Sequence, residues 1–165
     1  MRSVDIHSLQ FNPFDKIGNE WMLITAGDET AHNTMTASWG GVGVIWSKPV
    51  STCYVRPQRY TFEFTEKYEY YSLCFFDETY RPALNLCGSK SGRDMDKDAA
   101  AGLTCEFRNG VPYYKEASLV LICRKLYGQF LTEDSFTDAS IYARNYPEHD
   151  LHKMYIGEIL EVLEK

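Results

Sequence analysis

The chain has 165 residues, 44% of them hydrophobic, and this length and composition suit a single domain over residues 1–165 with one well-formed core. Its formal net charge of −6 argues against a nucleic-acid partner, because binding to a phosphate backbone needs a basic surface. No apolar run approaches the roughly 20 residues of a membrane span, and the first residues lack the order of a signal peptide, so we expect a cytoplasmic protein without membrane contact.

Short segments rich in β-branched and aromatic residues, each bounded by turn residues, predict many strands. In chain order these segments are Trp21–Ala26, Val42–Trp46, Val50–Val55, Tyr70–Phe76, Leu103–Phe107 and Ser118–Leu131. Within the last of them, the alternation of Leu119, Leu121 and Cys123 with their neighbours predicts one buried face. The segment Met154–Leu163 fits a strand or a helix; we favour a strand, because Gly157 would cost a helix about 1 kcal/mol relative to alanine.

Helical signals are sparse. We expect short helices at Thr61–Lys67, with Thr61 as the N-cap, at Glu78–Leu86, closed by Gly88, and at Asp94–Ala101. Many short strands with few helices are typical of a barrel or a sandwich. The strand–helix alternation of a doubly wound sheet is absent, so the predicted fold class is mainly β.

The cysteines carry information about the redox environment. An odd number of them and the absence of a CxxC pair fit reduced thiols better than disulfides. Four lie inside apolar stretches, where cysteine packs as a small hydrophobic residue. The five are Cys53, Cys74, Cys87, Cys105 and Cys123.

Several well-known motifs are incomplete in this chain. The glycines within 40–43 lack the third glycine and the following helix of a dinucleotide-binding loop, and the lysine within 88–91 does not follow a glycine as in a P-loop. His149 and His152 form an HxxH pair without a third well-spaced ligand, so we expect no metal site. No Gly-x-Ser-x-Gly elbow of a serine hydrolase is present.

The segment Asn33–Trp39 (NTMTASW) differs from these incomplete motifs. Thr34, Thr36 and Ser38 alternate with Met35 and Ala37, which on a strand edge or in an extended loop would give a row of hydroxyl and backbone N–H groups. Such a row suits a planar heterocycle edged with carbonyl and nitrogen acceptors.

Two further segments are suited to bind a phosphate group. Val55–Thr61 (VRPQRYT) places Arg56 and Arg59 three residues apart, followed by a hydroxyl at the start of a predicted helix. Ser89–Arg93 (SKSGR) adds two cations and two serines before the next predicted helix. Each cluster alone fits a solvated loop, but the presence of three in one short chain makes that interpretation harder to sustain.

At these residues the sequence resembles the flavin reductase-like FMN-binding split-barrel family, and within it the flavoredoxin branch. The resemblance extends from about Trp21 to Glu158 and is carried by three stretches in a fixed order. They are NTMTASWGGVGVIWSKPVSTCYVRPQRYT at 33–61, SGRDMDK at 91–97 and DLHKMYIGEI at 150–159.

The resemblance implies a six-stranded Greek-key barrel that forms a homodimer, with FMN bound non-covalently near the interface. Residues matched to the ring and ribityl chain are Asn33, Thr34, Met35, Thr36, Ala37, Ser38 and Trp39. Residues matched to the phosphate are Arg56, Arg59, Thr61, Ser89, Lys90 and Ser91. Cys53 would lie on the strand next to the flavin, and His152, the candidate catalytic residue, near the ring face where a nicotinamide stacks.

The leading hypothesis is an FMN-dependent oxidoreductase that takes a hydride from NADH or NADPH, with His152 as proton donor or nicotinamide platform. An alternative is a flavin-binding electron carrier, reduced by a redox partner protein and without a nicotinamide site of its own. A third alternative keeps the barrel and replaces FMN with haem or pyridoxal phosphate. Cys53 is interpreted as a packing residue, since no second cysteine lies near it in sequence.

Overall fold

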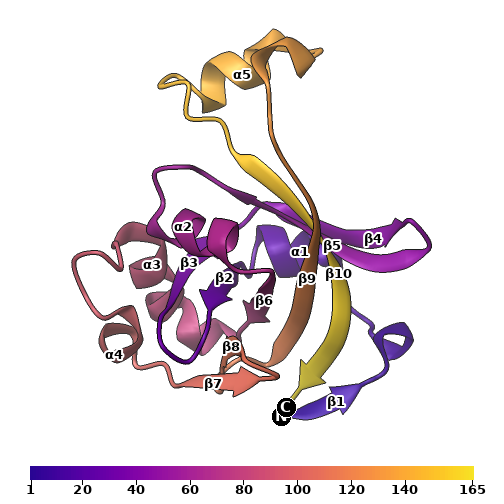
Figure 1. Cartoon of the computed structure of the whole chain (residues 1–165), viewed down its shortest axis with the longest axis vertical. Helices are drawn as coiled ribbons and strands as arrows, with labels where there is room; N and C mark the ends of the chain where they lie inside the picture. Colours follow the sequence, from indigo (N-terminus) through magenta and orange to yellow (C-terminus); the bar gives the residue numbers. More distant parts are fainter.

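The computed structural model describes residues 1–165. One eight-stranded antiparallel sheet dominates it, with a two-stranded hairpin beside it (Figure 1). The strands are β1 (Arg2–Val4), β2 (Met22–Gly27), β3 (His32–Ala37), β4 (Gly40–Ile45), β5 (Lys48–Val55), β6 (Tyr70–Phe75), β7 (Cys105–Arg108), β8 (Val111–Tyr114), β9 (Leu119–Phe130) and β10 (Lys153–Glu164). The helices are α1 (Pro13–Gly18), α2 (Tyr60–Lys67), α3 (Arg81–Ser89), α4 (Lys97–Ala101) and α5 (Ala139–Asn145). None of these helices is long and apolar enough to cross a membrane.

The large sheet curls into a barrel. Its strand order is β3-β2-β6-β9-β10-β5-β4, with β1 also paired to β10. β3 and β4 stand at opposite ends of this order but follow each other in the chain, joined only by Ser38 and Trp39. The start of β4 therefore lies against β2, where a Cβ added at Gly40 would be 3.0 Å from Met22 Cε. The segment 33–39 thus lies where the two ends of the sheet meet.

The two longest strands, β9 and β10, bend as they cross the barrel. Their pairing shifts register between Ile156 and Gly157 and again between Ile159 and Glu161, and such irregularities bend a strand and increase its twist. Gly157 is required by close packing, because a Cβ there would come within 2.3 Å of the Tyr71 hydroxyl.

Two apolar clusters make up the core. The larger fills the barrel and includes Ile24, Leu73 and Leu121. The smaller lies between the outside of the sheet, α3 and the β7–β8 hairpin, and includes Leu84 and Val120. The first half of β9 is therefore buried on both faces, and the prediction of one buried face is wrong because the hairpin and α3 cover the second.

The mainly β fold class is confirmed, and each predicted strand is present with small shifts at its ends. The ambiguous segment Met154–Leu163 lies in strand β10, as favoured. β1, β8, α1 and α5 were not predicted. They are short elements, and α5 belongs to a polar segment without an apolar period.

The helices depart from the predictions at their ends. α2 begins at Tyr60 with Arg59 in the N-cap position, so Thr61 is inside the first turn and is not the cap. α3 continues through Gly88. A Cβ added at this position would lie 3.3 Å from the Thr36 side chain, so the glycine permits close packing against β3 and does not end the helix. α4 begins later than predicted, because the Asp96 side chain caps it by accepting from two backbone N–H groups.

The connection between β9 and β10 extends away from the barrel. Figure 1 shows α5 standing apart from the other elements, at the end of this connection. We refer to residues 131–152 as the arm. The arm carries Tyr146 and His152, so its attachment to the barrel affects the candidate site.

Candidate functional site

The edge strand β3 forms one wall of the site, because only one of its edges is paired, to β2. The Thr34 carbonyl accepts a hydrogen bond from the Lys97 ammonium at 2.8 Å, so the backbone groups of Thr34 point away from β2. Residues two apart in a strand point the same way, and Thr36 therefore directs its backbone N–H and C=O to this side as well. β3 thus offers backbone hydrogen-bonding groups along its free edge.

The threonine hydroxyls of β3 are engaged inside the protein. The Thr34 Oγ1 shares a hydrogen bond of 2.9 Å with Thr25 Oγ1, and Thr36 Oγ1 donates to the Leu84 carbonyl at 2.5 Å. These bonds attach β3 to β2 and α3. Thr34 lines neither cavity. Thr36 and Ser38 both line one, although the Thr36 hydroxyl already donates to the Leu84 carbonyl.

A cavity of about 270 Å³, which we call the β3 cavity, opens beside the end of this strand. Its walls combine backbone, flat aromatic rings and two arginines, a mixture that suits a planar, partly polar ligand. The lining residues are Met35, Thr36, Ala37, Ser38, Trp39, Tyr54, Arg56, Arg59 and His152.

A second cavity of about 150 Å³, the cationic cavity, adjoins it, and Arg59 lines both. Three cationic side chains, Arg59, Lys90 and Lys97, line the cationic cavity and no carboxylate does. In a chain of net charge −6, such an uncompensated group of cations favours an anionic ligand. The other lining residues are Gln58, Tyr60, Thr61, Gly88, Ser89 and Ser91.

The guanidinium of Arg59 is held by backbone carbonyls. Its Nη1 donates to the Gly88 carbonyl at 2.9 Å and its Nη2 to the Cys87 carbonyl at 3.3 Å. Burial lowers the pKa of Arg59 somewhat, but a guanidinium stays protonated in proteins. Because neither partner is a carboxylate, the positive charge of Arg59 remains for a ligand.

Lys97 is a cavity residue to which the sequence analysis assigned no role. Its side chain is 5% exposed, and its Nζ donates to the Thr34 carbonyl at 2.8 Å and to the Cys87 carbonyl at 3.0 Å. Burial, reinforced by the charge of nearby Arg59, lowers the pKa of Lys97 to about 8. An ammonium has three N–H donors, so one remains for a ligand. The SGRDMDK stretch contains this lysine, but nothing in the stretch shows that α4 turns it inward.

Asn33 supports the cationic cavity from behind. In the amide orientation that satisfies both its oxygen and its nitrogen, the oxygen accepts from the Thr61 hydroxyl at 2.7 Å and from the Thr61 N–H at 3.2 Å. Gly92 packs directly against the same amide. A Cβ at this position would come within 2.0 Å of it. Asn33 therefore positions the start of α2 and the 89–93 turn, and does not line either cavity.

Arg56 is directed to the arm and not to the cationic cavity. Its guanidinium forms an ion pair with Asp150, donates to the Asn145 carbonyl at 3.0 Å and lies 5.2 Å from the centre of the Tyr146 ring. The hydrogen bond from Arg56 holds the pKa of Asp150 below its usual value. Arg56 therefore does not line the cationic cavity and its charge is paired with Asp150, so the prediction that both arginines hold one phosphate stays a prediction for Arg56.

His152 lies at the inner end of the β3 cavity and is 9% exposed. Its Nδ1 shares a hydrogen bond of 2.9 Å with the Tyr146 hydroxyl, and its ring centre is 5.0 Å from that of Trp39. Burial, followed by the charge of Arg56, lowers the pKa of His152 to about 4. The imidazole is therefore neutral near pH 7, and its role as proton donor or nicotinamide platform stays a prediction.

Thr34 and Cys53 lie away from both cavities. Thr34 is 1% exposed and Cys53, on β5, is 1% exposed inside the barrel core. Burial raises the pKa of the Cys53 thiol far above its ordinary value, so it stays protonated. This agrees with its interpretation as a packing residue and removes it from the residues facing a ligand.

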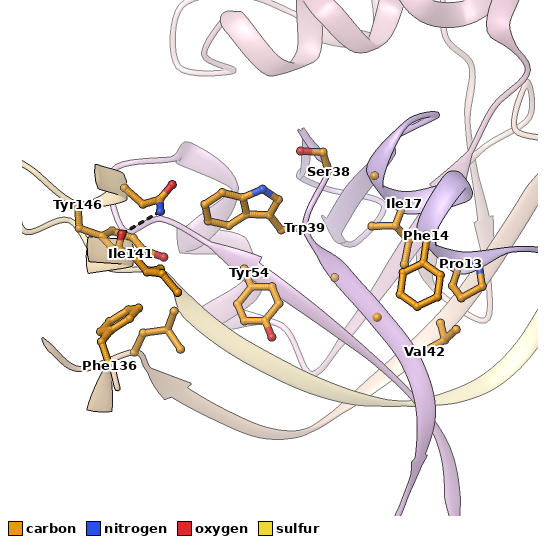
Figure 2. A pocket seen from close by; sticks show the side chains of 15 residues that line it. Pro13, Phe14, Ile17, Ser38, Trp39, Val42, Tyr54, Phe136, Ile141 and Tyr146 are labelled. Atoms are coloured by element: carbon orange, nitrogen blue, oxygen red, sulfur yellow. Dashed lines mark hydrogen bonds between the residues drawn. The ribbon is translucent and has the colours of Figure 1, made fainter. Parts of the chain in front are cut away.

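A larger cavity of about 640 Å³, the arm cavity, lies on the other side of Trp39 and Tyr54. Figure 2 shows these two rings between the α1 side chains of Phe14 and Ile17 and the arm side chains. The arm contributes Leu131, Phe136, Ile141, Asn145 and Tyr146 to the lining. Ser38, Trp39 and Tyr54 line this cavity as well as the β3 cavity, so the two spaces share a wall.

Solved structures resemble this fold over nearly its whole length. An FMN-binding protein from Thermus thermophilus is 21% identical with a TM-score of 0.68, covering 100% of this chain and 82% of its own. Flavoredoxin of Desulfovibrio vulgaris (Miyazaki F) is 20% identical with a TM-score of 0.69, and the match covers 88% of this chain and 69% of the flavoredoxin. Flavoredoxin from Methanosarcina acetivorans is 20% identical with a TM-score of 0.69, and the match covers 96% of this chain and 75% of the flavoredoxin.

At such identities these likenesses establish the split-barrel fold alone. A comparison with curated protein sequences finds no significant match. The sequence itself matches a family described as "Flavin reductase like domain" over residues 14–165. This match covers most of the chain and confirms the resemblance seen in its three motifs, so the chain belongs to the flavin reductase-like domain family.

Proposed function

We propose that this chain binds FMN non-covalently and uses it as a redox cofactor. The observation that carries the proposal is the junction of the two cavities at Arg59, one lined by cations and the other by flat side chains and the free edge of β3. A phosphate monoester joined to a planar ring needs this pair of environments. The FMN-binding protein and the flavoredoxins of similar fold support the proposal.

The cationic cavity fits a phosphate dianion. Arg59 and Lys97 donate in the structure to carbonyl oxygens only, and their charges lack a carboxylate partner there. The start of α2 borders the same cavity, and the partial positive charge of a helix N-terminus adds to that of the cations. In this proposal Arg59, Lys97 and Lys90 hold the phosphate, with hydroxyls from Ser89 and Ser91.

The β3 cavity would hold the ring system. Segment Met35–Trp39 would flank it, with the backbone of Thr36 and the hydroxyl of Ser38 as hydrogen-bonding groups. Asn33, Thr34 and Cys53 shape the site from behind, through the hydrogen bonds and packing described above, and Thr61 lines the cationic cavity.

Bound FMN would supply hydride and single-electron chemistry at its ring. The chain's own contribution is to orient the ring and to keep water from it. The rings of Trp39 and His152 would form one wall beside the flavin. Trp39 and Tyr54 separate this space from the arm cavity, which leaves room for a second flat substrate. We propose that this second substrate is NADH or NADPH, which donates a hydride, and that the protein is an FMN-dependent oxidoreductase.

An anaerobic titration tests both parts of the proposal. The purified protein is expected to be yellow with a flavin spectrum, and addition of NADH or NADPH to bleach it. A colourless protein that takes up no FMN would contradict flavin binding. A strong Soret band would indicate haem, and a pyridoxal spectrum the corresponding phosphate cofactor. A yellow protein that neither nicotinamide bleaches would exclude the reductase activity alone.

The flavoredoxins among the similar structures favour one alternative, an electron carrier without a nicotinamide site. In that case a reduced iron–sulfur partner protein would bleach the flavin, and NADH and NADPH would not. Comparing bleaching rates for the two kinds of donor separates the alternatives.

Three broader expectations stay predictions: a single domain over residues 1–165, a homodimer and a cytoplasmic location. The arm bears on the dimer, because it extends from the barrel and carries the exposed Ile141. Light scattering during gel filtration measures the mass in solution; a mass of one chain would contradict the dimer.

A further inference from the structure

A cluster of three metal-ligating side chains lies outside the proposed flavin site. His32 at the start of β3, Asp98 on α4 and Cys105 at the start of β7 each offer one ligand atom, and these atoms lie within 4.8 Å of one another. Figure 1 shows α4 and β7 beside the turn that leads into β3. His32 and Asp98 are 66 residues apart in sequence, so only the fold brings them together.

Two of the three groups, the imidazole of His32 and the carboxylate of Asp98, are already oriented by neighbours. His32 Nε2 and Asp98 Oδ2 share a hydrogen bond of 2.7 Å, and the other Asp98 oxygen accepts from the Tyr114 hydroxyl at 2.6 Å. The ring of Phe107 packs edge-on against His32 with the ring centres 5.9 Å apart. Fixed outer partners of this kind orient the ligands of metal sites in proteins.

Cys105 differs from the other cysteines of the chain. It is half-buried, whereas the other four are buried in the core. The side chains of His32 and Asp98 are 24% and 23% exposed. The cluster is therefore open enough for an ion to enter and for solvent to complete its coordination.

We propose that His32, Asp98 and Cys105 form a binding site for a borderline-soft divalent cation such as Zn²⁺, with water as the fourth ligand. A thiolate and an imidazole select such ions over Mg²⁺ and Ca²⁺, which prefer oxygen ligands. One carboxylate and one thiolate neutralise the two charges of the ion. Binding releases the thiol proton of Cys105 to solvent. His32 binds as a neutral imidazole, with its proton on the ring nitrogen that does not face the ion.

The geometry requires only small movements. Zinc bonds of about 2.0–2.3 Å in a tetrahedron place ligand atoms roughly 3.3–3.8 Å apart. The cluster spans 2.7 to 4.8 Å, so shifts of about 1 Å bring its atoms to these separations. This proposal departs from the expectation of no metal site, which considered only the pair His149 and His152.

The site is separate from the cationic cavity, although α4 contributes to both. Lys97 turns toward Thr34 and Cys87, while the next residue, Asp98, turns toward His32 and Tyr114. Zinc binding therefore does not depend on whether the chain binds FMN, and flavin content can be measured in parallel as an independent quantity.

The test uses the protein as purified, with its flavin content recorded. After incubation with Zn²⁺ and removal of loosely held ions on a desalting column with a weak chelator, elemental analysis is expected to find about one zinc per chain. Cys105→Ala and His32→Gln should each lower zinc affinity at least 100-fold, since loss of a ligand outweighs the 10–100-fold cost of losing an outer partner. The matched controls His7→Gln and Cys123→Ala remove the same residue types elsewhere and should retain zinc.

A second measurement needs no variant. Cys105 is the most accessible thiol, so a thiol-alkylating reagent should modify it first in the native protein, as located by peptide mass spectrometry. Zn²⁺ should protect it and Mg²⁺ should not. Absence of protection by Zn²⁺, or zinc contents of Cys105→Ala and His32→Gln equal to wild type, would overturn the proposal.

Discussion

Arg56 and Arg59 lie three residues apart in one motif, yet their side chains lie in two regions that differ in whether the positive charge is neutralised. Arg59 donates its hydrogen bonds to the carbonyls of Cys87 and Gly88 and faces a cavity lined by cations. Arg56 pairs with the Asp150 carboxylate and lies against Tyr146 of the arm. Positive charge remains for a ligand in the first region and is already neutralised in the second.

The difference shows how to recognise an arginine that is available to bind an anionic ligand. Sequence spacing makes the two residues equivalent, whereas the existing hydrogen-bond partners separate them. A carbonyl orients a guanidinium without removing its charge, and a carboxylate does both. The comparison predicts that Arg59 acts on the phosphate of FMN and Arg56 on the attachment of the arm.

The largest effect is expected from Arg59→Ala. Loss of a charge-assisted hydrogen bond costs roughly 1.5–3 kcal/mol, which is about 10- to 150-fold in dissociation constant. FMN affinity should fall by this factor, while the affinity for riboflavin, which lacks the phosphate, should change little. Fluorescence quenching titrations of both flavins measure the two constants. Equal losses for both flavins would show that Arg59 does not contact the phosphate.

A pH effect of about tenfold is expected from Lys97. Its pKa is lowered to about 8 in the free protein, so its charge is present below that pH and is lost as the pH rises through it. The phosphate stays a dianion over this range. FMN affinity should therefore fall about tenfold from about pH 7 to about pH 9, because each unit above the pKa removes tenfold of the charged form.

Two controls sharpen this prediction. Riboflavin affinity should not follow the same curve, because riboflavin has no group for the ammonium to pair with. Lys97→Met should bind FMN more weakly at neutral pH and should lose the dependence between about pH 7 and 9. A pH curve that survives in Lys97→Met would assign the titration to another group.

The strands of the barrel could be predicted from sequence, because β-branched and aromatic runs between turn residues are local signals. The three ligand-binding segments could also be located, since their residue types stand out in an acidic chain. The burial of both faces of β9 could not be predicted, because the second face is covered by α3 and the β7–β8 hairpin. The helix ends were displaced for a similar reason: Gly88 fits against Thr36 rather than ending α3.

The detailed roles of site residues needed the fold. Arg56 meets a carboxylate 94 residues away, and Lys97 meets a carbonyl 63 residues away. No local pattern reports such distant partners. Residue type therefore identified the chemistry of the site, and tertiary contacts decided which of the candidate residues carry it out.

A smaller effect on binding is expected from Arg56→Ala. The variant loses the ion pair with Asp150 and the contact with Tyr146, so the arm should detach more readily and be cut faster in limited proteolysis within 131–152. FMN and riboflavin should both bind only a few-fold more weakly, and by the same factor. If Arg56→Ala instead weakens FMN alone, as Arg59→Ala is expected to, the distinction between the two regions fails.

The smallest effect concerns the protonation of His152, a residue of the β3 cavity whose pKa is also lowered by the charge of Arg56. Because its pKa is lowered to about 4, the imidazole is neutral at every pH above about 5, and the rate of flavin reduction should show no inflection near the ordinary histidine value of about 6.5. Stopped-flow absorbance over that range measures the rate, and nuclear magnetic resonance of the imidazole measures the pKa directly. The charge of Arg56 contributes to the lowering, so Arg56→Ala should raise this pKa, and loosening of the arm, which carries His152, should raise it further. An inflection near 6.5 in the wild type that disappears in His152→Gln would instead make this histidine a proton donor, and would mean that the arm opens to water during the reaction.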